Sequence, residues 1–243
     1  MWSIYKKEIH LFLSSLVGYI AVAVFLLATG LFMWVFPDYS VISYGFSSMD
    51  GFFSMAPYIF LFLIPAITMR SFAEEIQTGT IELLNTRPLT EWDILLGKFF
   101  AALSLVLVAI LPTLVYFFSI YELGLPKGNL DFGGTLGSYL GLFFLGSSFI
   151  SIGIFASSIT KNQIVAFLLG LFLCAFFYDA FSSISKLPIF FGWADLILEY
   201  CGINFHYASI SKGLLDTRDL IYFISLSLFF LLATRFSLER KKW

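Results

Sequence analysis

The chain alternates between long apolar runs and short polar segments. Crossing the hydrocarbon core of a bilayer takes about 20 predominantly apolar residues in a helix. Six runs meet this requirement, each nearly free of charged side chains, and they span residues 16–36, 52–69, 99–121, 135–159, 164–182 and 220–236. Pro112, in the third run, predicts a kink that neighbouring helices can accommodate. The pattern therefore predicts an all-α integral membrane fold with six transmembrane helices, forming one transmembrane domain over residues 1–243.

Two further segments are apolar without being long enough to span. In residues 1–15, apolar side chains such as Trp2 and Ile9 recur at helical spacing, and the lysines between them face elsewhere. This spacing is typical of an amphipathic helix that lies at the membrane interface. Residues 183–219, before the last run, are about half apolar. We expect short helices or a re-entrant piece there, packed on the spans, because irregular backbone at membrane depth must be buried in protein.

Lysine and arginine divide unevenly between the two sides of the predicted membrane. Ten of the 14 lie on one side, in the head, in the segment 70–98, in the turn after the fourth run and in the tail. Cytoplasmic loops carry the excess of positive charge, so this side is expected to be cytoplasmic. An even number of spans places both termini on the same side. Both termini are therefore predicted to be cytoplasmic.

Composition excludes a soluble protein. Hydrophobic residues make up 59% of the chain and charged residues only 12%, whereas a soluble domain carries about 25% charged residues. The net charge is −2, without a strongly basic or acidic block, so nucleic acid is not an expected partner. A chain this apolar can be covered only by lipid.

Catalytic motifs that would suit a membrane enzyme are missing from the sequence. Gly97-Lys98 is followed by Phe99 and is not preceded by a phosphate-binding loop, so ATP hydrolysis would belong to another polypeptide. An intramembrane hydrolase would need a His-Glu-x-x-His pair or a second intramembrane aspartate beside Asp179. A secondary transporter would need ionisable residues near the midplane and internal repeats. The spans carry almost no such charge, so both classes are disfavoured.

A stripe of small residues marks the fourth run. Gly133, Gly137 and Gly141 recur every fourth residue. Small residues on one helix face let another helix backbone approach closely. The stripe therefore predicts a helix-packing site. Packing within this chain is favoured over an interface between subunits, and both readings stay open.

The cytoplasmic segment 70–98 is the second candidate site. Its charges are concentrated between two apolar runs, Gly79-Thr80 breaks its first helical stretch, and Thr90 with Asp93 resembles a capping box at the next helix start. A solvated linker would not need these helix breaks and caps, so we favour a docking surface for a cytoplasmic partner. The candidate docking residues are Phe72, Glu74, Glu75, Gly79, Thr80, Glu82, Leu83 and Pro88, and the three glutamates are expected to pair with basic residues of the partner.

The same segment resembles the cytoplasmic loop of ABC-2 type permeases. That family shows an acidic residue, Gly-Thr, Glu-Leu-Leu, Pro-Leu and then Gly-Lys at the start of the third span. The matching positions here are Glu75, Gly79-Thr80, Glu82-Leu83-Leu84, Pro88-Leu89 and Gly97-Lys98. The interfacial head, the six spans and the apolar loop before the last span also resemble the family. More narrowly, the chain resembles the gliding-motility-associated ABC permease of GldF type.

The resemblance implies a membrane-spanning subunit of an ATP-binding cassette transporter in the inner membrane of a bacterial cell. It implies a coupling helix in segment 70–98 that docks on a separate cytoplasmic ABC ATPase. That ATPase would bind ATP and Mg²⁺, so no cofactor is expected in this chain. It further implies a second permease subunit, identical or different, and in the gliding type a partner with a large extracytoplasmic domain. Transport of a solute and purely mechanical or scaffolding work are both compatible with such a loop.

Overall fold

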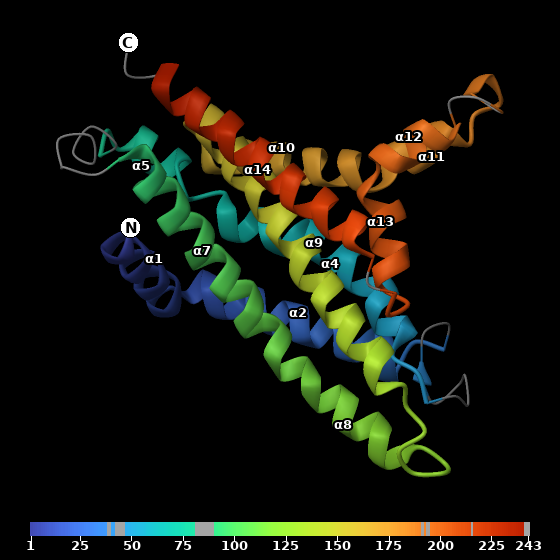
Figure 1. The fold of residues 1–243 in the computed structure, drawn as a ribbon. Coiled ribbons are helices and arrows are strands. Elements are labelled where there is room, and N and C mark those ends of the chain that lie inside the picture. Colours follow the sequence, from blue (N-terminus) through green and yellow to red (C-terminus); the bar gives the residue numbers. More distant parts are fainter. Residues whose placement is uncertain are drawn as a thin grey trace.

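The computed structural model describes residues 1–37, 40–41, 47–80, 90–190, 192, 195–214 and 216–240. Over these ranges every regular element is a helix, and the longest helices form a bundle (Figure 1). In chain order the elements are α1 (Trp2–Ser14), α2 (Leu16–Trp34), α4 (Asp50–Thr68), α5 (Ala73–Gln77), α7 (Glu91–Ile110), the 3-10 turn η1 (Leu111–Thr113), α8 (Leu114–Leu123), α9 (Phe132–Ile159), α10 (Gln163–Ala175), the π-helical turn η2 (Phe176–Ala180), α11 (Phe181–Ser185), the 3-10 turn η3 (Pro188–Phe190), α12 (Asp195–Cys201), α13 (Ile203–Ile210) and α14 (Thr217–Arg240).

The helices are long and apolar enough for a multi-pass membrane protein. Within the described ranges, five stretches meet the length and hydropathy of a span: Asp50–Gln77, Glu91–Leu123, Phe132–Ile159, Gln163–Ser185 and Thr217–Arg240. A sixth is reached when α1 and α2, which are bent by 68° at their junction, are counted together. The prediction of an all-α membrane fold is confirmed.

Local sequence explains where the third spanning stretch begins and where it changes geometry. Thr90 caps α7, because its hydroxyl accepts from the Asp93 amide at 3.2 Å and its own amide donates to the Asp93 carboxylate at 3.2 Å. This reciprocal pair is the capping box predicted from the sequence. Further along, Pro112 lies in the 3-10 turn that separates α7 from α8, because proline cannot donate the next helical hydrogen bond.

Helix α9 lies at the centre of the bundle and packs against α4, α7, α10 and α14. Lipid tails are as apolar as leucine, so helices in a membrane associate through close packing rather than through apolar burial alone. Small residues on α9 permit this approach, and a β-carbon on Gly146 would lie 3.1 Å from a methyl group of Val106 on α7. The hydroxyls of buried serines such as Ser147 and Ser151 donate hydrogen bonds to the backbone carbonyls three residues earlier, with an oxygen–oxygen distance of 2.7 Å in each case. Other helices can therefore approach the α9 backbone closely, and these two buried hydroxyl groups have hydrogen-bond partners within the helix.

The glycine stripe of α9 packs within the chain. A β-carbon on Gly137 would lie 2.9 Å from the Gly213 Cα, and one on Gly141 would lie 2.6 Å from a methyl group of Ile210. Gly133 meets only Asp131 of its own turn, and Gly134 makes the close approach to Gly213 instead. Gly137 and Gly141 of the stripe, together with the adjacent Gly134, therefore contact the end of α13 and the turn that follows it.

Residues 183–219, where they are described, contain α12 and α13 and the ends of the neighbouring helices. α13 packs on α9 and α14, and the Nδ1 atom of its buried His206 lies 2.7 Å from the carboxylate of Asp219 in the first turn of α14. Tyr207 donates to the Phe53 carbonyl of α4 at 2.7 Å. α12 carries no buried residue and lies beside α11, away from the bundle (Figure 1).

Candidate functional site

The turn that connects α4 to α5 is fixed to the central helix by one serine. Ser157, near the end of α9, accepts hydrogen bonds from the amides of Phe72 and Ala73 at 3.0 Å each. Its hydroxyl donates to the Met69 carbonyl at 3.0 Å. The first amides of a helix have no partner inside that helix, so a hydroxyl at this place satisfies donors that would otherwise be unpaired. The start of α5 is thereby attached to α9.

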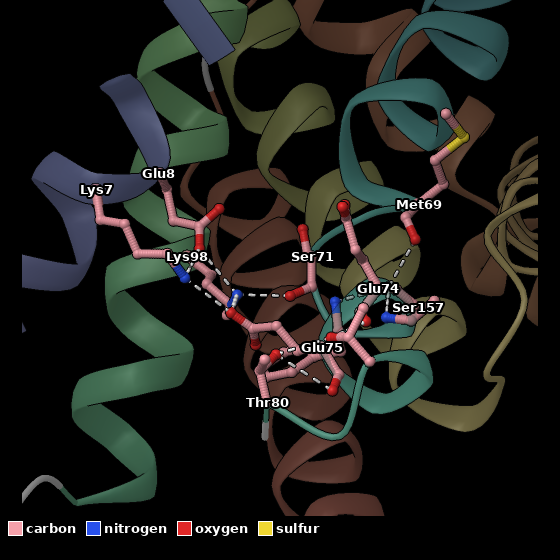
Figure 2. A network of polar contacts seen from close by, with 12 residues as sticks. Lys7, Glu8, Met69, Ser71, Glu74, Glu75, Thr80, Lys98 and Ser157 are labelled. Atoms are coloured by element: carbon pink, nitrogen blue, oxygen red, sulfur yellow. Dashed lines mark hydrogen bonds and ion pairs between the residues drawn. The ribbon is translucent and has the colours of Figure 1, made fainter. Parts of the chain in front are cut away.

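A buried lysine attaches the same segment to α7. Lys98 is only 3% exposed, and its ammonium group lies 2.9 Å from a carboxylate oxygen of Glu75 on α5. It lies equally close, 2.9 Å, to Glu8 on α1. It also donates to the Ser71 carbonyl and stands 5.0 Å from the ring centre of Phe72. One side chain of α7 therefore holds both α1 and α5, as Figure 2 shows.

Lys7 completes this network at its edge. Its ammonium group lies 3.0 Å from the same Glu75 oxygen and 3.6 Å from Glu8. Burial alone would lower the pKa of Lys7, but the charges and hydrogen bonds of Glu75 and Glu8 outweigh it, and the pKa is raised. Two cations thus face two carboxylates. A buried charge must be paired in this way because its removal from water is otherwise too costly.

The opposite side of the segment faces outward. Exposed residues run from Glu74 through Gln77, Thr78 and Gly79 to Thr80. Gly79 has a φ of +74° with open space around its Cα, which is the left-handed conformation that glycine adopts readily after a helix. α5 is therefore a five-residue helix with one face fixed to the bundle and an accessible face and end.

The predicted docking residues fall into three groups. Glu74, Gly79 and Thr80 are exposed, whereas Phe72 is 1% and Glu75 9% exposed. Glu75 is therefore not an exposed charge such as a docking surface presents, because its buried carboxylate is paired with Lys98 and Lys7 of the same chain. Three further predicted docking residues lie outside the described part of the chain: Glu82, Leu83 and Pro88.

Sequence reasoning missed the side chains that hold the segment in place. The sequence places Lys98 in segment 70–98 at the start of the third span but gives it no partner within the chain; in the structure it lies inside α7 and pairs with Glu8 and Glu75. Glu8 lies on the amphipathic head helix, 90 residues away in sequence, and Ser157 is one of several serines on α9. The one available signal was a charge at the start of an apolar run, which in a membrane protein requires a partner.

These features define a class of protein: a multi-pass helical membrane subunit with a short, firmly anchored helix between two of its long helices. A comparison with protein families gives the particular assignment. Residues 2–187 match the family described as ABC-2 family transporter protein, and the chain belongs to that family. The chain is thus a membrane permease subunit of an ABC transporter, the family that its loop motif resembled. A comparison with curated proteins finds no match.

Proposed function

We propose that this permease subunit couples ATP hydrolysis by a separate cytoplasmic ABC ATPase to work across the inner membrane, with α5 as its coupling helix. The observation that carries the proposal is the two-sided character of α5. Its inner side is attached to α9 through Ser157 and to α7 and α1 through the network of Lys98. Its outer side is exposed. A push on the outer side would therefore reach three helices at once.

The arrangement of the chain ends supports a cytoplasmic position for α5. The amino group of Met1 lies 3.3 Å from Asp93 at the start of α7. Arg235, near the end of α14, lies 3.4 Å from Glu91. The N-terminus, α5, the start of α7 and the end of α14 thus share one end of the bundle (Figure 1). This end carries the excess of lysine and arginine in the sequence, and we place it in the cytoplasm.

Different residues of the segment take different parts in this proposal. Glu74, Gly79 and Thr80 form the surface offered to the ATPase, and Glu74 is the acidic group available for a basic side chain of the partner. Phe72 and Glu75 transmit motion instead of making contact, because both are buried. ATP and Mg²⁺ belong to the ATPase. The predicted contacts of Glu82, Leu83 and Pro88 would extend the same surface.

The narrower assignment rests on the sequence resemblance alone. We propose that the chain belongs to the gliding-motility-associated branch and assembles with a second permease subunit, which in that branch has a large extracytoplasmic domain. Transport of a solute and mechanical work both fit this coupling. Affinity purification from native membranes, followed by identification of the co-purifying chains, tests the narrower assignment. Recovery of an ATPase with only a second copy of this chain contradicts the assignment to the gliding branch.

Site-directed cross-linking tests the docking surface. Cys201 is exposed and Cys174 is buried, so Cys201→Ser provides a background without an accessible thiol. In it, Thr78→Cys should form a cross-link to the ATPase with a short bifunctional reagent that reacts with a thiol and an amine. Glu122→Cys, exposed near the end of α8, is the matched control and should not react with the ATPase. Equal cross-linking at both positions, or at Glu122→Cys alone, refutes the proposed docking surface.

A further inference from the structure

A cavity of about 440 Å³ lies between α1 and α5, beside the ion-pair network. Its walls come from the second half of α1, from the turn after α4 and from the end of α5. Its volume is within the range of ligand-binding pockets, about 300–1,000 Å³. The docking function proposed above accounts for the outer side of α5 and leaves this cavity unexplained.

The cavity is lined by charges of both signs, and two of these are uncommitted. Lys7, Glu8, Glu75 and Lys98 neutralise one another. Arg70 and Glu74 also line the cavity, and neither forms an ion pair with any described residue. Among the described residues, neither the buried Arg70 Nε atom nor the second carboxylate oxygen of Glu75, a residue that is 9% exposed, has a hydrogen-bond partner. An unpaired guanidinium and an unpaired carboxylate together favour a ligand that carries both charges.

One wall of the cavity is apolar and continues onto the outer surface of α1. Leu11 and Phe12 line it. Leu11 and Leu13 are about half exposed, and Leu16, the first residue of α2, is 75% exposed. Apolar side chains along an amphipathic helix lie against the boundary between lipid headgroups and acyl chains. The cavity therefore opens beside the place where the acyl chains of a lipid would run.

We propose that this cavity binds the headgroup of a zwitterionic phospholipid with a primary ammonium group, of the phosphatidylethanolamine type. Arg70 would hold the phosphate, and Glu74 would accept hydrogen bonds from the ammonium group. An anionic phospholipid would leave Glu74 facing negative charge. A choline headgroup has no N–H to donate to Glu74. The proposal depends on α1 lying at the membrane surface on the side of α5, as in the proposed function.

Such a lipid would touch α1 and α5 together. Glu74 lies on the accessible face offered to the ATPase. A bound headgroup and a basic side chain of the ATPase would therefore both contact the Glu74 carboxylate. Lipid occupancy would thus adjust docking at the same surface. Specific basic pockets for headgroups at the cytoplasmic side of membrane helices provide the physical precedent.

Lipid retention tests this proposal. The complex purified from native membranes would be exchanged into nanodiscs that contain phosphatidylethanolamine, phosphatidylcholine or the anionic phosphatidylglycerol. Native mass spectrometry would then count the lipids that stay bound to the protein. The wild-type permease should retain the ethanolamine lipid over the choline lipid by about tenfold or more, the expected loss of one charge-assisted hydrogen bond. Glu74→Gln should abolish this preference, and Arg70→Gln should lower the retention of both lipids. Glu122→Gln, whose carboxylate pairs with exposed Lys127, should retain the preference.

Three results overturn the proposal. Equal retention of ethanolamine and choline lipids removes the role of Glu74. If the wild type prefers phosphatidylglycerol, and this preference is lost in Arg70→Gln but kept in Glu74→Gln, the cavity binds an anionic lipid instead. No retained lipid, together with loss of ATPase from Arg70→Gln, assigns it to a side chain of the ATPase. Cross-linking at Thr78→Cys is measured in parallel: if it persists while lipid preference is absent, the lipid site fails and the docking function stands.

Discussion

Lys98→Met is the substitution that examines the anchored segment most directly. Methionine has a similar volume and keeps the apolar stem of the side chain, so the change removes chiefly the charge and its hydrogen bonds. In the native protein the ammonium group lies 2.9 Å from both Glu8 and Glu75 and donates to the Ser71 carbonyl. After the substitution two buried carboxylates face each other with Lys7 as their remaining counter-charge.

The expected loss of unfolding free energy follows from this geometry. Removing one partner of a buried ion pair typically costs about 3–5 kcal/mol because the other charge stays buried and unpaired. Lys7 still lies 3.0 Å from Glu75 and 3.6 Å from Glu8, and we therefore expect about 3 kcal/mol, the lower end of that range. Adding Glu75→Gln to Lys98→Met removes one stranded carboxylate. It should recover part of the loss, which identifies charge rather than packing as the cause.

Equilibrium unfolding in mixed detergent micelles, followed by tryptophan fluorescence, measures this loss. Lys127→Met is the matched control, since Lys127 forms an ion pair with Glu122 that is exposed to solvent, and exposed pairs contribute little. A stability of Lys98→Met equal to that of Lys127→Met would show that the network does not hold α5 to α1 and α7. Failure of the double variant to recover any stability would instead assign the effect of Lys98 to packing.

Two further predictions follow from the same contacts. Glu75→Lys should lower membrane abundance, measured by immunoblotting, because it places a third cation against Lys7 and Lys98. Glu74→Lys should leave abundance unchanged and reduce co-purification of the ATPase. Low abundance of Glu74→Lys with normal abundance of Glu75→Lys would contradict the assignment of Glu75 as buried and Glu74 as exposed. Gly141→Leu should destabilise the protein more than Gly133→Leu in the same unfolding assay. A side chain at Gly141 meets Ile210, whereas Gly133 faces open space apart from Asp131. Equal losses of unfolding free energy in the two variants would show that α9 and α13 are not in close contact.

The sequence predicts well those features that depend on neighbouring residues or on average polarity. Long apolar runs predict helices, and the helices have the length of membrane spans. The Thr90–Asp93 capping box and the irregular turn at Pro112 are also local, and both are present. Each needs only residues within one helical turn, so no knowledge of the tertiary arrangement is required.

Long-range pairing could not be predicted in the same way. Glu75 has the sequence environment of a solvated acidic residue, and its burial depends on Lys98 and Lys7, which come from two other helices. The glycine stripe shows a similar limit. Its spacing of four predicts a packing face, but only the position of Gly213 explains why Gly134 makes the close contact in place of Gly133.

The short length of α5 explains why its anchors matter for coupling. A helix of five residues is not stable in isolation, because forming the first turn is unfavourable and too few hydrogen bonds follow it. Its conformation therefore depends on Ser157 at its start, on the burial of Phe72 and on the pairing of Glu75. These three attachments lead to different helices: α9, α7 and α1. A force on the exposed face consequently cannot move α5 by itself. It either shifts the starts of α1 and α7 and the end of α9 as one unit, or breaks the buried ion pairs that hold them together.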